Sequence, residues 1–310
     1  MTHDFLSELL PTDFRVSVCR LILRFVSDGG LGDEGAASAV RNGIGCGLKR
    51  VSDCTESADC PCPYCRYFKP QPPPGTAGGI SPAFVLEADG FPKRPRVGDA
   101  ARLNLLMLGE ACQALPSFVC GLLHCGEVGI GSPRARFAVN PQGEPVELAM
   151  EDIQRQAEAL LGVRECAIHF VSPCILEDVG RRRDDITFPR LVKAVVERLQ
   201  PNVGYWCGAA MRNKDRDAIA APLMEKASGI EAEFTFEGRV REVSKGFGGK
   251  QDSLSGFTGV LRARGDLDPF WPLLIAGSLV HVGLRPHLDR GRYALRPIIG
   301  QEEVELCFTS

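Results

Sequence analysis

Apolar residues along the chain recur with two periods, and the switches between them predict the elements of the first half. The stretch from Phe14 to Val26 is rich in β-branched and aromatic residues, which favours a strand. From Gly35 to Val51, small and apolar residues recur at helical spacing, although each internal glycine costs about 1 kcal/mol against alanine. After a proline-rich loop at 70–79, the pattern predicts strands at 83–87 and 102–108, a helix at 110–123 and a strand at 134–140.

The second half of the chain repeats the same order of elements. Glu165 to Val171 predicts a strand, and Phe188 to Leu199 has the apolar spacing of an amphipathic helix. The pattern then predicts a helical insertion at 209–226, strands at 232–243 and 256–264, a helix at 267–280 and a strand at 291–298. A β-α-β-β-α-β unit is the ferredoxin-like motif. We therefore predict an α+β fold of tandem ferredoxin-like (RRM-like) domains, divided into residues 1–155 and 156–310.

Length and charge constrain the partners. The 310 residues suit two domains, and 36 basic against 39 acidic residues give a net charge of −3. Because nucleic-acid-binding domains usually carry a basic excess, an RNA ligand would require the positive charge to be gathered on one face. The N-terminus lacks the basic region of a signal peptide, and no apolar run reaches the roughly 20 residues of a membrane helix. These features predict a cytoplasmic protein that does not contact membranes.

Four of the thirteen cysteines fall within twelve residues, in the segment DCTESADCPCPYC. Their thiolates are soft ligands that suit tetrahedral zinc, and an all-cysteine site normally leaves no open position for a reacting water. We predict a structural zinc site formed by Cys54, Cys60, Cys62 and Cys65. Cys46 is a possible substitute ligand, and free thiols in a loop are the alternative interpretation.

Two other motifs bear on chemistry. The glycines at 43, 45 and 47 match neither the Walker A pattern nor the dinucleotide-binding fingerprint, so no nucleotide cofactor is expected. The segment from His281 to Tyr293 (HVGLRPHLDRGRY) combines two imidazoles with three arginines and two glycines. Arginines in such a loop can bind phosphate through charge-assisted hydrogen bonds, although a solvated charged hairpin would have the same composition.

Four stretches, in this order, resemble the CRISPR repeat-RNA endoribonucleases of the RAMP superfamily. They are AASAVRNGIGCGLKRV with CRYFKP; PAFVLEADG with ARLNLLMLGEACQALPSFVCGLLHCGEVGIGSPRARFAV; HFVSPCIL with the helix from Phe188; and GFTGVLRARGDLDPFWPLLIAGSLVHVGLRPHLDRGRYAL. The resemblance implies binding of CRISPR repeat RNA and its cleavage to mature crRNA without a catalytic metal. The ribose 2′-hydroxyl would attack the adjacent phosphate, giving a 2′,3′-cyclic phosphate. Other subunits of a CRISPR effector complex are possible partners.

The chain departs from the family where many members place a histidine, in or near the first helix. Arg41, Lys49 and Arg50 occupy this region instead, and arginine can orient a phosphate but is a poor base. We therefore predict a catalytic set of Arg41, Arg285, His287 and Arg292, in which His287 transfers the proton. The predicted RNA-binding residues are Lys49, Arg50, Arg134, Arg136, Arg181, Arg182, Lys245, Lys250 and Arg290. The alternative is an RNA-binding subunit that does not cut.

Overall fold

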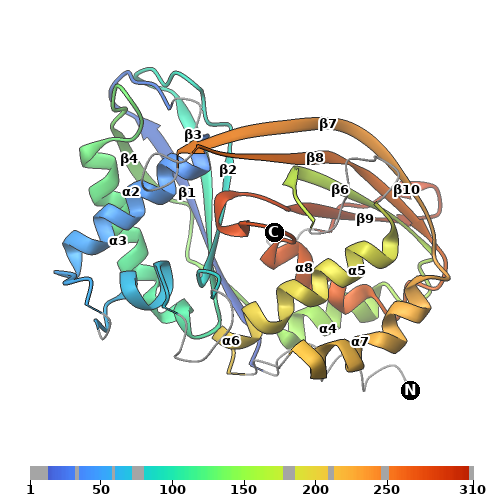
Figure 1. Ribbon diagram of the computed structural model, residues 1–310. Helices are drawn as coiled ribbons and strands as arrows, with labels where there is room; N and C mark the ends of the chain where they lie inside the picture. The colour runs from blue at the N-terminus through green and yellow to red at the C-terminus, as the bar shows by residue number, and fades with distance from the viewer. Residues whose placement is uncertain are drawn as a thin grey trace.

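The computed structural model describes residues 13–31, 35–57, 60–71, 80–176, 186–208, 213–245 and 251–306, and arranges them around two antiparallel sheets (Figure 1). The strands of the first sheet are β1 (Arg15–Phe25), β2 (Phe84–Asp89), β3 (Ala100–Leu108), β4 (Phe137–Pro141) and β5 (Val146–Ala149). Their order is β2-β3-β1-β4, with β5 also paired to β1. We call β1 to β4, with their connecting helices, the N-terminal unit. Its strand order is that of a ferredoxin-like fold.

Helices α2 (Ala36–Val51) and α3 (Leu115–Val128) cover one face of this sheet, and a 3₁₀ segment, η3 (Gly109–Ala114), precedes α3. The inward residues of β1, such as Leu21 and Leu23, are buried beneath the two helices. The helices approach so closely that a Cβ at Gly47 would collide with the carbonyl oxygen of Gly121. The glycines that weaken α2 as an isolated helix therefore permit its contact with α3.

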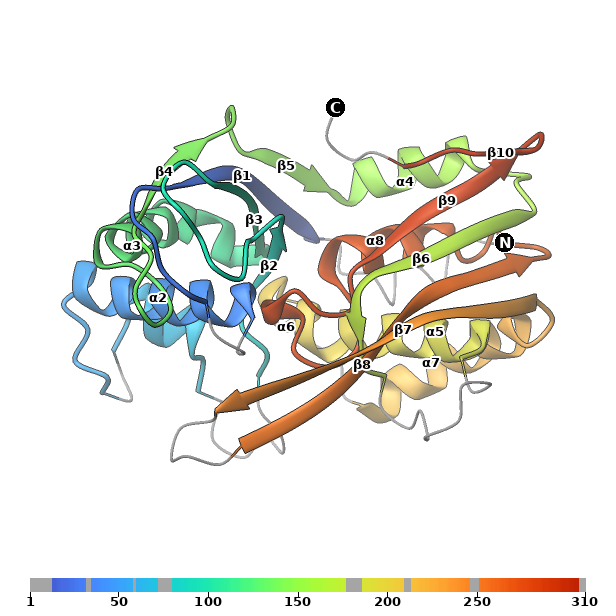
Figure 2. The same cartoon turned by 90° about the horizontal axis from the view of Figure 1, so that it is seen from above.

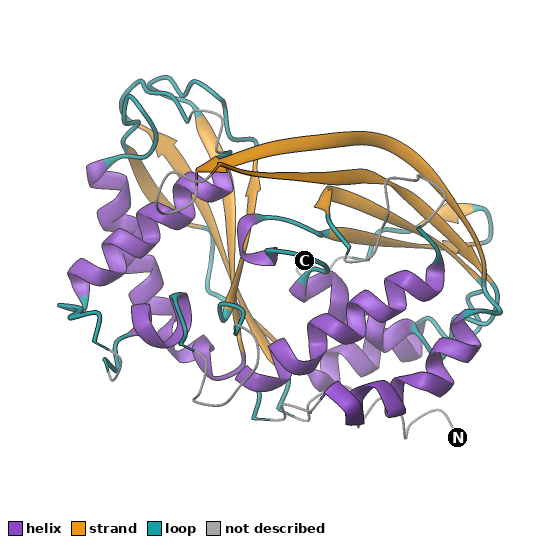
Figure 3. Cartoon of the chain, viewed as in Figure 1, coloured by secondary structure: helices purple, strands orange, loops and turns teal. Residues whose placement is uncertain are grey.

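The second sheet comprises β6 (Glu165–Cys174), β7 (Glu231–Lys245), β8 (Gln251–Arg264), β9 (Tyr293–Ile299) and β10 (Glu302–Glu303), in the order β10-β9-β6-β8-β7. We call β6 to β9 and their helices the C-terminal unit. Its helices lie on one face of the sheet (Figure 3): α4 (Met150–Ala159), α5 (Phe188–Glu197), α6 (Gly204–Trp206), α7 (Asn213–Ala227) and α8 (Trp271–Val280). A π-helical turn, η5 (Arg198–Val203), joins α5 to α6. Beyond the last β6–β8 pair, β7 and β8 continue as a two-stranded ribbon.

The two units share a hydrophobic core. Val16, Leu106 and Val85, from three strands of the first sheet, are buried in one cluster with Trp271 and the other core residues of the C-terminal unit. At this end the first sheet therefore buries both of its faces. The units pack as one body, and side chains from both can be held at fixed positions between them.

The structure confirms the predicted fold class, because both units have the ferredoxin-like order. The sequence prediction missed β5 and α4 and began the last helix four residues early. It also predicted one helix at 110–123, where the structure has the 3₁₀ segment η3 followed by α3. The domain division at residue 155 stays a prediction. Within the described ranges, no helix combines the length and the hydropathy that a membrane span requires.

Candidate active site

A loop of unusual backbone geometry follows α8 and lies between β2 and α2 (Figure 2). It contains the short 3₁₀ turn η6 (Pro286–Leu288), and three of its non-glycine residues have positive φ: His281 (58°), Arg285 (57°) and Asp289 (52°). Such a conformation costs about 1–2 kcal/mol per residue, so contacts elsewhere must hold the loop in place. One such contact is the hydrogen bond from the N–H of Leu284 to the carbonyl oxygen of Ile175 (3.0 Å), next to Gly283, where a Cβ would collide with the same oxygen.

The loop places His287 among arginines. The charges that act most strongly on its imidazole are those of Arg41 from α2, Arg198 from η5, and Arg285 and Arg290 from the loop itself. We call these four residues the arginine cluster. Arg198 and Arg290 are each only 3% exposed. Because like charges brought close together repel one another, an anion that bound among these guanidinium groups would be stabilised by all four.

Several nitrogens at this site are buried without a hydrogen-bond partner. They are Nε of Arg41, Nη2 of Arg198 and Nδ1 of His287. The rest of Arg198 is well anchored: its Nε donates to the carbonyl oxygen of Val280 (3.0 Å) and its Nη1 to Oγ of Ser81 (3.2 Å). An unsatisfied buried donor costs about 1–3 kcal/mol, and a phosphate oxygen would satisfy the two guanidinium donors.

The surroundings set the protonation states of these groups. Burial, reinforced by the four arginine charges, holds the pKa of His287 well below its usual value of 6.5. Burial also lowers the pKa of Arg41, and it lowers the pKa of Arg198 to about 10. At neutral pH the site therefore combines protonated arginines with a neutral imidazole, which can accept a proton.

Aromatic rings of the N-terminal unit support both sides of the site. The Cζ atom of Arg41 lies 4.6 Å from the ring centroid of Phe68, which belongs to the π-helical turn η2 (Tyr64–Phe68). Phe68 stacks on Phe84 with 5.3 Å between centroids, and Phe84 meets the ring of His287 edge-on at 6.2 Å. The core of one unit thus positions an imidazole supplied by the other.

Arg292, at the end of the loop, pairs with carboxylates. Its Nη1 and Nη2 donate to Asp89 at 3.0 and 2.5 Å, and Nη1 lies 3.6 Å from Glu87. Its Nε lies 3.6 Å from Asp289. Burial would lower the pKa of Arg292, but its bond to Asp89 and the three negative charges outweigh burial and raise it.

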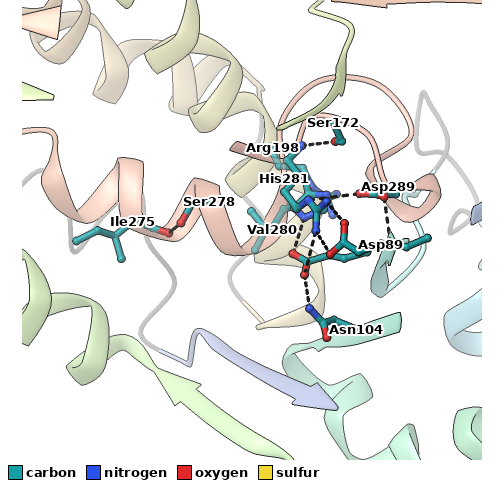
Figure 4. Close-up of polar contacts among 12 residues, drawn as sticks. Asp89, Asn104, Ser172, Arg198, Ile275, Ser278, Val280, His281 and Asp289 are labelled. Carbon is teal, nitrogen blue, oxygen red and sulfur yellow. Dashed lines mark hydrogen bonds and ion pairs between the residues drawn. The ribbon is translucent and has the colours of Figure 1, made fainter. Parts of the chain in front are cut away.

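Three further contacts join the same group (Figure 4). We call this group the inter-unit cluster; it consists of Glu87, Asp89, Asn104, His281, Asp289 and Arg292. His281, fully buried, lies with Nε2 3.1 Å from Oε1 of Glu87, and Asn104 donates to the same carboxylate at 2.7 Å. Burial alone would raise the pKa of Glu87, but the bond and charge of His281, with the charge of Arg292, lower it to about 2. Asp289 accepts the backbone N–H of Ala88 (3.0 Å) on the edge strand β2. The cluster therefore fastens the loop to the N-terminal unit.

Replacing Arg292 by alanine should destabilise the protein by about 3 kcal/mol, because it leaves Glu87 and Asp289 partly buried without their cation. Urea denaturation measures this change. Arg296→Ala, on the strand β9 that follows Arg292, is the matched control: its guanidinium is more exposed and pairs with Glu303 and Glu305, so we expect a loss below about 1 kcal/mol. Slower RNA cleavage by Arg292→Ala at unchanged stability would instead favour the catalytic role predicted from the sequence.

Comparison with solved structures identifies the fold. One chain, from a structure titled as a partial Cas6-RT-Cas1–Cas2 complex, matches with a TM-score of 0.58 and 14% identity over 97% of this chain and 49% of its own length. A second, titled as the Cas6-RT-Cas1–Cas2 complex, gives 0.58 and 14% over 97% of this chain and 31% of its own. A third, a Cas6 product complex, gives 0.52 and 16% over 89% of this chain and 98% of its own.

The fold is Cas6-like. This chain spans about half or less of the length of the first two neighbours and nearly all of the third. The domain family AF_1859_N, described as an N-terminal domain, matches residues 14–158, which is slightly less than half of the chain. No curated protein matches the sequence.

Within the Cas6-like fold, the predicted catalytic residues separate into two groups. Arg41, Arg285 and His287 come together from distant parts of the sequence, and Arg290, predicted to bind RNA, joins them. Arg292 lies in the inter-unit cluster, with its guanidinium directed at carboxylates. Arg198 was missed by the sequence prediction. Its signal was a cation three residues after Val195, on the apolar face of the predicted helix.

The other predicted RNA-binding residues are scattered. Lys49 pairs with Glu56 at 2.6 Å and lies over the ring of Tyr64. The side chains of Arg50, Arg134 and Arg136 are exposed, Arg50 on α2 and the other two between α3 and β4. Arg181, Arg182 and Lys250 lie outside the described residues, as does the side chain of Lys245. RNA binding by these residues stays a prediction.

The four clustered cysteines also come together. The Sγ atoms of Cys54, Cys60, Cys62 and Cys65 all lie within 4.8 Å of one another, close enough to share a metal ion. Cys46, the possible substitute ligand, is exposed on α2 and is not part of this group.

An open pocket elsewhere on the surface offers different chemistry. Its lining includes the carboxylates of Asp13, Glu110 and Glu151 and one cation, Arg15. Because the carboxylates outnumber the cation, this pocket suits the phosphates of RNA less well than the arginine cluster does.

Proposed function

We propose that this chain is a metal-independent endoribonuclease that cleaves CRISPR repeat RNA to mature crRNA. The observation that carries the proposal is the position of the His287 imidazole among the four guanidinium groups of Arg41, Arg198, Arg285 and Arg290. A phosphodiester needs cations for its oxygens, and cleavage by the adjacent 2′-hydroxyl needs a base. The Cas6-like fold, shared with a structure titled as a Cas6 product complex, supports CRISPR RNA as the substrate.

In the proposed reaction, arginine donors hold the non-bridging oxygens of the scissile phosphate in line for attack. His287 accepts the proton of the 2′-hydroxyl, the 2′-oxygen forms a bond to phosphorus, and the bond from phosphorus to the 5′-oxygen breaks. The leaving oxygen takes up a proton, which gives a 5′-hydroxyl and a 2′,3′-cyclic phosphate. Fixed guanidinium groups stabilise the charge that develops on the phosphate, so the chemistry assigns no role to a catalytic metal.

Protein partners and location belong to the same proposal. Two neighbours are chains of complexes whose titles name Cas1 and Cas2, which supports other CRISPR proteins as partners. An enzyme that processes CRISPR transcripts would work in the cytoplasm, as predicted from the sequence.

End-labelled repeat RNA incubated with the protein in EDTA tests the proposal. We expect one major cut and a product that ends in a 2′,3′-cyclic phosphate. A 2′-deoxy substitution at the mapped scissile nucleotide should abolish cleavage and leave binding intact, because it removes only the nucleophile. A matched RNA with the 2′-deoxy group one nucleotide away should be cut normally.

Three outcomes would contradict this mechanism. Cleavage of the 2′-deoxy RNA would require a different nucleophile. Cleavage that needs added Mg²⁺ would indicate a metal-dependent nuclease. Tight binding without cleavage would support the alternative, a non-catalytic RNA-binding subunit of a CRISPR effector complex.

A further inference from the structure

The cysteine cluster has the dimensions of a tetrahedral metal site. The Sγ atoms of Cys54 and Cys60 are 4.0 Å apart, those of Cys54 and Cys65 are 3.4 Å apart, and all four lie within 4.8 Å of one another. Four thiolates around zinc, at bonds of about 2.3 Å, stand about 3.8 Å from one another. A disulfide would require about 2.05 Å. We infer that Cys54, Cys60, Cys62 and Cys65 bind one zinc ion, which fixes η2 against α2.

The backbone turn around Cys54 favours metal binding by this residue. Cys54 is the third residue after α2, and its N–H donates to the carbonyl oxygen of Lys49 in the last turn of that helix (2.9 Å). Asp53 and Glu56 both have positive φ, at 46° and 54°, and this turn aims the N–H of Glu56 at Sγ of Cys54 (3.4 Å). An N–H directed at the sulfur stabilises a thiolate, which is the form that binds metal. Metal binding would offset the cost of two strained residues.

The other three ligands lie in or just before η2, with Cys60 and Cys62 preceding it and Cys65 inside it. Cys62 is buried and accepts the N–H of Arg66 on its carbonyl oxygen, and Cys65 is the second residue of η2. The ion would therefore connect the C-terminal end of α2 to this turn. With four sulfurs its coordination is complete, which leaves no position for a reacting water and makes the site structural.

The turn that the ion would hold is the one that supports the arginine cluster. Tyr64 stacks on Phe68 with 5.3 Å between centroids, and Phe68 lies against both Arg41 and Phe84. A displaced η2 would withdraw Phe68 from beneath the guanidinium of Arg41. The zinc ion would thus position Arg41 indirectly, by holding the ring of Phe68 in place beneath its guanidinium.

Metal analysis of the purified full chain tests the inference directly. We expect one zinc per chain, released with free thiols when a mercurial reagent titrates the cysteines. Growth or refolding with Co²⁺ should give the intense visible absorption of tetrahedral cobalt and the near-ultraviolet charge-transfer band of thiolate ligands. Zinc-loaded protein should unfold at a higher temperature than zinc-depleted protein, by roughly 5 °C or more.

The double variant Cys60→Ser with Cys65→Ser should lose the zinc and the cobalt spectrum. The control is Cys120→Ser, because Cys120 is exposed on α3 and outside the cluster; it should keep both. If the wild-type chain binds neither metal, or if the double variant keeps stoichiometric zinc, the inference is wrong. Thiol counting that finds these cysteines oxidised in pairs would overturn it as well. None of these measurements involves RNA, so a chain that binds zinc without cutting RNA contradicts only the proposed function.

Discussion

Replacing His287 by alanine is expected to slow single-turnover cleavage of repeat RNA by about 10²–10⁴-fold, the usual contribution of a proton-transferring group. RNA affinity should change little, because the imidazole is neutral and the arginines that attract the polyanion remain. Cleavage rate at saturating protein and equilibrium binding, measured on the same labelled RNA, separate the two effects. His124→Ala is the matched control, since His124 lies on α3 beside Glu127, and it should cleave at the normal rate.

The pH profile gives a second measurement of the same role. Because burial and the arginine charges lower the pKa of His287, the imidazole is neutral and active above its folded pKa and becomes protonated only as pH falls through that value. The acidic limb of kcat/KM, which reports the free enzyme, should therefore lie below pH 6.5. His287→Ala should remove this limb. A limb at or above pH 6.5, or unchanged cleavage by the variant, would assign the proton step to another group.

Arg41→Ala should have the second large effect, a loss of about 10²–10³-fold in cleavage rate together with weaker RNA binding. The reason is that its guanidinium lies half-buried over Phe68 in the arginine cluster, and the proposed mechanism uses this cluster to stabilise the charge that develops on the phosphate. Arg41→Lys should recover part of the affinity and little of the rate, because an ammonium supplies charge without the planar pair of donors. Single-turnover rates and binding curves distinguish these cases.

Arg50→Ala is the control for this experiment, because Arg50 is exposed on the same helix and should affect affinity alone. If Arg41→Ala abolishes cleavage while His287→Ala cuts normally, catalysis rests on arginine positioning without a histidine base. If neither variant differs from the wild type, the reaction takes place elsewhere on the chain or not at all.

Much of the fold could be predicted because the signals for it are local. β1 was found from its β-branched composition and α5 from its apolar spacing, and the repeated order of elements pointed to two ferredoxin-like units. α4 was missed because the short strand β5 runs directly into it, and because α4 is mostly polar, with Ile153 and Ala157 as its buried residues. The glycines of α2 permit its close contact with α3, and this contact could not be predicted from the sequence of α2 alone.

The candidate site was harder to predict, because its electrostatics depend on residues distant in sequence. Arg292 looked like its neighbours in a basic loop, yet its partners Glu87 and Asp89 precede it by about two hundred residues. Arg198 was missed because it stands alone among apolar residues of the predicted helix, where a single cation gives no pattern that indicates a binding site. Arg41 and His287 were named by their chemistry, and only the fold brought them together.

The division of the site between the two units has a consequence for fidelity. Arg41 and its aromatic support come from the N-terminal unit, His287 from the C-terminal unit, and the inter-unit cluster and the shared core hold them in register. A molecule whose N-terminal unit is unfolded or undocked loses Arg41 and the aromatic support of His287, and one whose C-terminal unit is unfolded loses the imidazole itself. If the chain is the nuclease proposed above, partial damage should therefore abolish cleavage and not produce an unselective enzyme, so that a misfolded copy would spare the other transcripts of the cell.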